Sequence, residues 1–157
     1  MTTAATTSRS PIAVPSQALG AIEVRPDTVL TVVEPLAGFP DATRYALIEH
    51  TRDGAATAGS VFWFQAVERP FHAFVVTDPW SIHPDYAPEI SDADAEQLGL
   101  SSFEDARVFG ILTVPRNPSE VTINLRAPVV VNVAQRLAKQ VVVLNDHYGT
   151  KHPMRRD

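Results

Sequence analysis

The sequence predicts an all-β fold: a folded sheet or small barrel-like fold of short strands, with one short helix. Short runs rich in Val, Ile, Thr and aromatic residues recur along the chain, and turn-forming residues separate them. The 157 residues include 13 prolines, and proline is largely confined to strand starts, edges and turns. Only one stretch carries the start and stop signals of a helix.

The expected strands follow one another over most of the chain. They are Gly20–Val24, Thr28–Val33, Arg44–Glu49, Val61–Val67, His72–Thr77, Arg107–Val114, Glu120–Leu125, Pro128–Val133 and Lys139–Leu144. Residues 68–70 suit the turn of a hairpin between two of these runs. Residues 51–60, which contain the turn pair Asp53-Gly54, are expected to form a flexible loop.

The expected helix covers about residues 91–98. Ser91 can cap its N-terminus, Asp94 completes a capping box, and Gly99 can end it. Two helical turns are unstable alone because nucleation is costly. We therefore expect this helix to dock on the sheet through apolar residues such as Leu98.

The chain is expected to contain one domain, residues 17–157, after a disordered N-terminal arm of residues 1–16. The arm is built from Thr, Ala, Ser and Pro without a period. The sequence has no cysteine and no apolar run long enough to span a bilayer, and its N-terminus lacks the apolar core of a secretory signal. These features predict a cytoplasmic protein without membrane contact, which we expect to be a monomer.

The net charge of −5 makes direct nucleic-acid binding improbable, since phosphates must be neutralised by Lys and Arg. The acidic residues are concentrated: the stretch from Pro70 to Ala106 has no Lys or Arg but 8 of the 18 carboxylates. These are Asp78, Asp85, Glu89, Asp92, Asp94, Glu96, Glu104 and Asp105. Such a stretch is either an ordinary solvated surface or a face that attracts a basic partner.

Enzyme chemistry is not indicated. The five histidines show no metal-ligand spacing, although His83 near Asp78 and Asp85 could form a loop site for a hard cation. There is no nucleophile elbow and no glycine-rich phosphate loop. We expect no cofactor. The alternative is a small-ligand or flavin-binding β-barrel enzyme, whose phosphate-binding bases these strands hardly supply.

Aromatic and amide side chains are the other candidates for recognition. Trp80 and Tyr86 lie in a proline-rich loop, where they either pack against the domain or anchor a partner. Asn124 and Asn132 flank the stretch NLRAPVVVN, where their amides either bind backbone at strand corners or face a partner. The consecutive Phe62, Trp63 and Phe64 belong to a strand buried on both faces or expose one ring.

The chain resembles the FliW family of flagellar assembly factors from about Gly20 to Pro153. The resemblance is carried, in order, by EPLAGFP, FWFQAV, FVVTDPW, PDYAPEIS, NLRAPVVVN, KQVVVL and YGTKHP. Each piece is weakly specific, but their common order and spacing are specific. The sequence departs from the family pattern at Ala66, where a serine is expected, and at Ala37, where a proline or similar residue is common.

The resemblance implies a cytoplasmic all-β protein without catalysis. FliW-like proteins bind flagellin before export and also bind CsrA, a small basic RNA-binding dimer that represses flagellin translation. Free FliW sequesters CsrA, whereas accumulated flagellin occupies FliW and releases CsrA. The candidate partner-binding residues are Asp78, Trp80, Asp85, Tyr86, Glu89, Asp92, Asp94, Glu96, Asn124 and Asn132.

Overall fold

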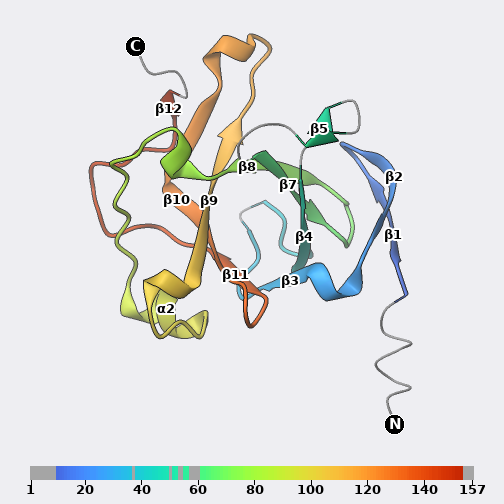
Figure 1. Cartoon of the computed structure of the whole chain (residues 1–157), viewed down its shortest axis with the longest axis horizontal. Helices are drawn as coiled ribbons and strands as arrows, with labels where there is room; N and C mark the ends of the chain where they lie inside the picture. The colour runs from blue at the N-terminus through green and yellow to red at the C-terminus, as the bar shows by residue number, and fades with distance from the viewer. Residues whose placement is uncertain (1–9, 37, 50, 53–54, 57–60, 154–157) are drawn as a thin grey trace.

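The fold is built around a closed β-barrel. A computed structural model describes residues 10–36, 38–49, 51–52, 55–56 and 61–153. Within them, the barrel strands are β3 (Val29–Val32), β4 (Arg44–Glu49), β7 (Val61–Ala66), β8 (Ala73–Thr77), β9 (Ala106–Thr113), β10 (Thr122–Asn132) and β11 (Leu137–Gln140). They pair in the order β11-β3-β4-β7-β8-β9-β10, and the β10–β11 pairing closes the ring (Figure 1). The all-β prediction is confirmed.

Shorter elements surround the barrel. The strands β1 (Ile12–Ser16) and β2 (Gly20–Val24) form a separate hairpin, β5 (Thr51–Arg52) pairs with β6 (Ala55–Ala56), and β12 (His152–Pro153) pairs with the start of β10. The α-helix α2 (Asp92–Gln97) and the 3-10 turns η1 (Pro26–Thr28), η2 (Pro79–Ser81), η3 (Phe103–Asp105) and η4 (Pro118–Glu120) complete the described elements. None of the described helices is long and apolar enough to cross a membrane.

Side chains fill the barrel interior. Tyr45 and Phe64, which are 0% and 1% exposed, stack with ring centroids 4.5 Å apart. Their strands β4 and β7 are paired in antiparallel register, so these two side chains point to the same face of the sheet. Phe109, Val129 and Val131 enter the same cluster from the other side of the ring. This packing makes the barrel a hydrophobic core.

The stretch NLRAPVVVN is a bent part of one strand. The register of β10 against β9 shifts between Asn124 and Val129, which marks a bulge. The Asn124 Oδ1 accepts hydrogen bonds from the backbone N–H groups of Arg126 and Ala127, at 3.0 and 2.9 Å, and so satisfies the bulge. Pro128 is tolerated there because a bulge can leave a ladder position without an N–H donor.

A second cluster covers the outer face of β9 and β10. Val130 belongs to it, whereas its neighbours Val129 and Val131 face the barrel interior, so β10 is buried on both faces. The covering residues come from the segment 80–100 and from residues 141–148, and they include Tyr86 and the fully buried Leu98. The expected docking of the helix region through Leu98 is confirmed.

Several predicted boundaries were wrong. Ile12–Ser16 lies in β1 and not in a disordered arm, because Val14 packs with Val24 of β2 on the outer face of β4. Residues 1–9 lie outside the described residues. The runs Glu120–Leu125 and Pro128–Val133 form one strand, and β11 ends at Gln140 rather than Leu144. In the expected flexible loop β5 pairs with β6, while Asp53-Gly54 is not described.

The prediction of β2, β4 and α2 was more accurate. Gly20–Val24 and Arg44–Glu49 are strands with the bounds expected from sequence. The helix α2 covers residues 92–97 inside the expected range. The turn at residues 68–70 connects β7 and β8 as an antiparallel hairpin.

Candidate partner-binding surface

Local capping fixes both ends of α2, the helix that carries part of the partner-binding surface predicted from sequence. The Ser91 hydroxyl accepts a hydrogen bond from the Asp94 backbone N–H at 3.0 Å, which confirms the N-cap. Gly99 has φ of 69°, the left-handed conformation that ends many helices. Since Leu98 between them is fully buried, the polar face of this short helix points to solvent.

Lys139 of β11 holds α2 against the barrel. Its Nζ donates to the Asp94 carboxylate at 2.6 Å and to the Gln97 side-chain oxygen, and it lies 3.7 Å from the Glu34 carboxylate. The Lys139 side chain is 11% exposed and that of Asp94 is 17% exposed. Asp94 is therefore largely neutralised and is a poor contact for a partner.

Four of the predicted acidic residues remain exposed, and we call them the acidic surface. They are Asp85, Glu89, Asp92 and Glu96. Glu104 and Asp105 of η3 are exposed in the same sequence segment. Among the described residues, Lys139 of β11 is the only Lys or Arg that pairs with a carboxylate of the stretch from Pro70 to Ala106. Its partner there is Asp94 and not one of the four exposed residues. The acidic surface keeps its negative charge available.

The predicted aromatic anchors are used inside the domain. Tyr86 is 4% exposed, and its hydroxyl donates to the Leu125 carbonyl at 2.7 Å. Burial raises the pKa of Tyr86 above its ordinary value, with a smaller effect from Tyr148, so this hydroxyl stays a donor. Trp80 is half-buried and donates its Nε1–H to the Tyr86 carbonyl at 2.7 Å. Asp78 caps η2 by accepting from the Trp80 N–H.

The two asparagines also bind backbone. Asn132 is 4% exposed, donates to the Leu98 carbonyl at 2.8 Å and accepts from the Gln135 N–H. It thereby fixes the end of α2 to the end of β10. Asn124 accepts hydrogen bonds from the backbone N–H groups in the bulge of β10. Of the two readings that the sequence left open, the structure supports backbone binding at strand corners for both residues.

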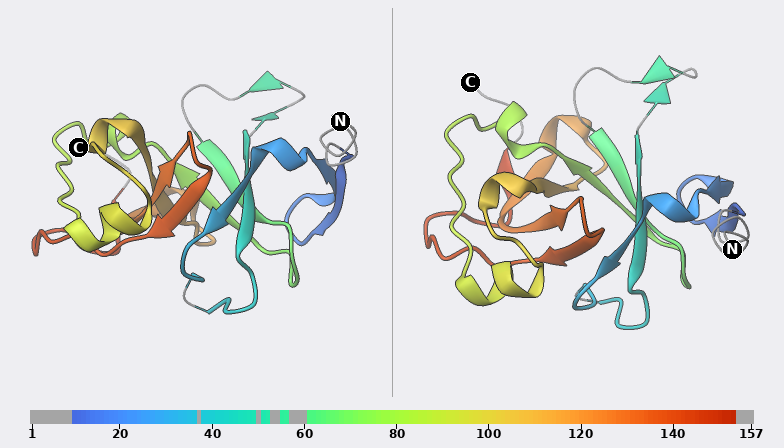
Figure 2. Two further views of the ribbon diagram at one scale, coloured as in Figure 1. Left: turned by 90° about the horizontal axis from the view of Figure 1, so that it is seen from below. Right: turned by 60° about the horizontal axis from the view of Figure 1, so that its bottom comes forward.

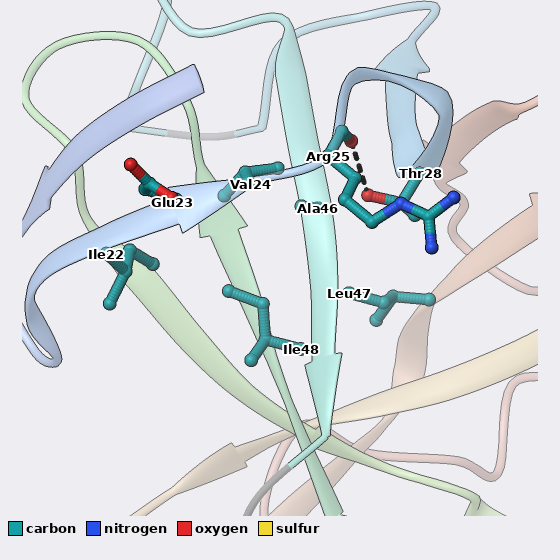
Figure 3. Close-up of a pocket in the computed structure, with 8 residues that line it drawn as sticks. All are labelled: Ile22, Glu23, Val24, Arg25, Thr28, Ala46, Leu47 and Ile48. Atoms are coloured by element: carbon teal, nitrogen blue, oxygen red, sulfur yellow. Dashed lines mark hydrogen bonds between the residues drawn. The ribbon is translucent and has the colours of Figure 1, made fainter. Parts of the chain in front are cut away.

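A separate apolar groove lies between the β1–β2 hairpin and β4 (Figure 3). Its volume is about 330 Å³, and its apolar lining is Ile22, Val24, Ala46, Leu47 and Ile48. Glu23, Arg25 and Thr28 border it, and the Arg25 carbonyl accepts a hydrogen bond from the Thr28 hydroxyl at 2.7 Å. Figures 1 and 2 show this hairpin and α2 on opposite sides of the barrel.

The groove was missed by sequence reasoning. Its strand β2 was predicted, but β1 was assigned to the arm, although the alternation of Ile12 and Val14 with small residues could have indicated it. The described residues contain no group of three His, Asp or Glu side chains placed to hold a metal ion. His83 instead contacts the Pro153 carbonyl at 3.2 Å.

Known proteins share both this sequence and this fold. The FliW protein family model matches residues 13–154. The flagellar assembly factors FliW of Pseudothermotoga lettingae and Natranaerobius thermophilus are 35% and 37% identical, over 85% and 88% of this chain and 83% and 89% of their own lengths. This chain belongs to the FliW family. A crystal structure of the flagellar assembly factor FliW superposes with a TM-score of 0.80 and 29% identity, covering 92% of this chain and 98% of that one.

Membership of the FliW family removes the enzyme alternative, because this is a family of flagellar assembly factors and not of enzymes. The barrel interior is filled by side chains that include Tyr45, Phe64 and Phe109. Ala66, one of the two departures from the family pattern, is buried in the same core. Ala37, the other departure, lies outside the described residues.

Proposed function

We propose that the chain is a partner-switching regulator that binds flagellin and, when free of flagellin, antagonises the translational regulator CsrA. The observation that carries the proposal is the acidic surface, whose four exposed carboxylates lie in a stretch without Lys or Arg. A basic protein such as CsrA is the complementary partner for such a surface. Complementary charge raises the association rate and makes binding salt-dependent.

The apolar groove suits flagellin in this scheme. The groove of about 330 Å³ has five apolar residues in its lining, beside Glu23, Arg25 and Thr28, and so fits aliphatic side chains of an extended or amphipathic segment. The segments of flagellin that are disordered before assembly supply such side chains. The β1–β2 hairpin beside the groove and the helix α2, which carries Asp92 and Glu96, lie on opposite sides of the barrel (Figure 2). The two partners therefore need not share contacts.

Mutual exclusion of the partners then requires that flagellin covers both sides of the barrel or that its binding changes the barrel. Either way the switch operates by occupancy, since a ligand that binds one state stabilises it by mass action. We propose that the protein acts in the cytoplasm as a monomer and does not contact RNA itself. The net charge of −5 supports the last point.

A pull-down tests the proposal. The tagged protein is incubated with purified CsrA, with flagellin, and with both, at low salt. The proposal predicts capture of each partner alone and loss of CsrA when flagellin is in excess. If the protein captured flagellin but never CsrA, it would be a flagellin chaperone without CsrA antagonism. A stable complex of all three proteins would contradict the switch.

A further inference from the structure

The segment that follows β11 has one free edge. Its Val141 and Val143 N–H groups donate to the Pro128 and Arg126 carbonyls of β10, both at 3.0 Å. Successive residues of an extended chain direct their N–H and C=O groups to opposite edges. The N–H and C=O groups of Val142 therefore point away from β10.

No described strand occupies the other side of Val142. The neighbouring strand β3 pairs with β11 only at Leu137 and Ala138, and its last contact is the Val33 N–H bond to the Ala138 carbonyl at 2.9 Å. Further along, the Leu144 N–H donates to the Glu89 carbonyl at 2.7 Å. The free edge is thus short, and chain segments limit it at both ends.

The side chains along this edge are apolar and exposed. Val142 and Leu144 are 58% and 62% exposed, whereas the alternating Val141 and Val143 are 1% and 4% exposed. An exposed strand edge with apolar side chains is a site for pairing with another chain unless it is protected by Lys, Pro or a bulge. The stretch Val142–Leu144 contains no Lys and no Pro.

The charge around the edge selects the partner. Glu34 is 59% exposed at the end near β3, and Glu89 and Asp146 are exposed at the other end. Lys139, the nearest base of β11, is 11% exposed and is occupied by Asp94, Gln97 and Glu34. An incoming strand with Lys or Arg beside its apolar residues would find carboxylates at both ends.

We propose that this edge, with Val142 at its centre, pairs with an extended basic and apolar segment of a partner protein, which is added to the barrel next to β11. Backbone hydrogen bonds to Val142 would give affinity, and contacts with Leu144, Glu34 and Glu89 would give selectivity. The inference rests on the proposed function in taking CsrA as the basic partner. Glu89 belongs to the acidic surface as well, so the edge and that surface are continuous.

Calorimetric titration of CsrA into variants of the full chain tests the edge. Val142→Pro removes the outward N–H but leaves the Val141 and Val143 N–H bonds to β10, and Val142→Thr is its control because it keeps the N–H. Leu144→Lys replaces an apolar side chain at the edge with a charged one. Its control is Val114→Lys, at a site that is 57% exposed. We expect Val142→Pro and Leu144→Lys to weaken binding about tenfold and each control less than about threefold.

Amide exchange of the unmodified chain gives a second measurement that does not depend on how a variant folds. The Val142 amide should exchange rapidly in the free protein and become protected on addition of CsrA. Unchanged exchange at Val142, or wild-type affinity of a folded Val142→Pro variant, would overturn the edge proposal alone. If the unmodified chain binds no CsrA at all, the proposed function falls together with it.

Discussion

The Lys139 Nζ lies 2.6 Å from the Asp94 carboxylate, and this contact ties barrel strand β11 to the first turn of α2. The two residues are 45 positions apart in the sequence. A helix of six residues has little stability of its own. The positions of Asp92 and Glu96 on this helix therefore depend on this ion pair and on the burial of Leu98.

Replacing the lysine should loosen α2. Lys139→Met leaves a partly buried carboxylate without its partner, so we expect the free energy of unfolding to fall by about 1–3 kcal/mol. Urea unfolding measures the change. The control is Arg25→Met, which breaks the exposed Arg25–Asp27 pair at 2.8 Å and should cost less than about 1 kcal/mol. Equal effects of the two substitutions would mean that Lys139 does not hold the helix.

Tyr86 should contribute to stability rather than to recognition. Tyr86→Phe leaves the buried Leu125 carbonyl without its donor, which should cost about 1–2 kcal/mol in thermal or urea unfolding. Tyr148→Phe is the matched control, since the Tyr148 hydroxyl accepts from the exposed Ala87 N–H, which water can serve instead. Both variants should bind CsrA like the unmodified chain. Weaker CsrA binding by a stable Tyr86→Phe protein would return Tyr86 to the partner-binding residues.

Stability should fall at mildly acid pH because of His72. The residue is 6% exposed, its Nε2 lies 2.7 Å from the Tyr45 hydroxyl, and burial lowers the pKa of His72. Below the ordinary histidine pKa of about 6.5, the unfolded chain takes up a proton that the folded chain does not. The free energy of unfolding should therefore decrease as the pH falls from about 6.5, by at most about 1.4 kcal/mol per pH unit from this group.

The variant His72→Gln keeps a hydrogen-bonding partner for Tyr45 but cannot titrate. Urea unfolding from pH 7.5 to 5 should give it a flatter profile than the unmodified chain. Some dependence on pH should remain, because burial and the nearby His83 and His147 also lower the pKa of His152. An identical slope in both proteins would exclude His72 as the source.

The apolar groove can be tested independently of CsrA. Ile48→Asn places a polar side chain in the groove, so the variant cannot form an apolar contact that the unmodified chain forms with flagellin. We expect flagellin binding to weaken about tenfold in a titration. Val114→Asn changes an exposed valine outside the groove and should leave flagellin binding unchanged. CsrA binding should survive in both variants. If Ile48→Asn, shown folded by its melting curve, binds flagellin normally, the groove is not the flagellin site.

Local signals in the sequence were sufficient for the parts of the fold that depend on neighbours in the chain. The cap at Ser91, the end at Gly99 and the bounds of β2 and β4 are set by residues within a few positions. The same holds for the concentration of acidic residues, which is a property of composition. These are the features that the structure confirms.

Contacts between distant residues could not be predicted in this way. Nothing near Asp94 indicates that Lys139 neutralises it, and nothing near Tyr86 indicates that its hydroxyl meets the Leu125 carbonyl. The strand β1 was missed although its sequence alternates, because its burial against β4 could not be seen from the residues of the arm alone. Sequence reasoning therefore found the acidic segment but could not tell which of its side chains remain available.

In the proposed function, the acidic surface recruits a basic partner through its charge. The most direct test is the association rate with CsrA, measured by stopped flow at low and high salt. The variant Asp92→Lys with Glu96→Lys changes two exposed carboxylates of this surface. The matched control, Glu49→Lys with Glu120→Lys, changes the net charge equally at β4 and at η4, away from α2.

Charge reversal of Asp92 and Glu96 should slow association about tenfold at low salt, and the control should slow it much less. High salt should remove the difference between the two variants. Equal association rates for the two variants and the unmodified chain at low salt would contradict this recruitment by charge.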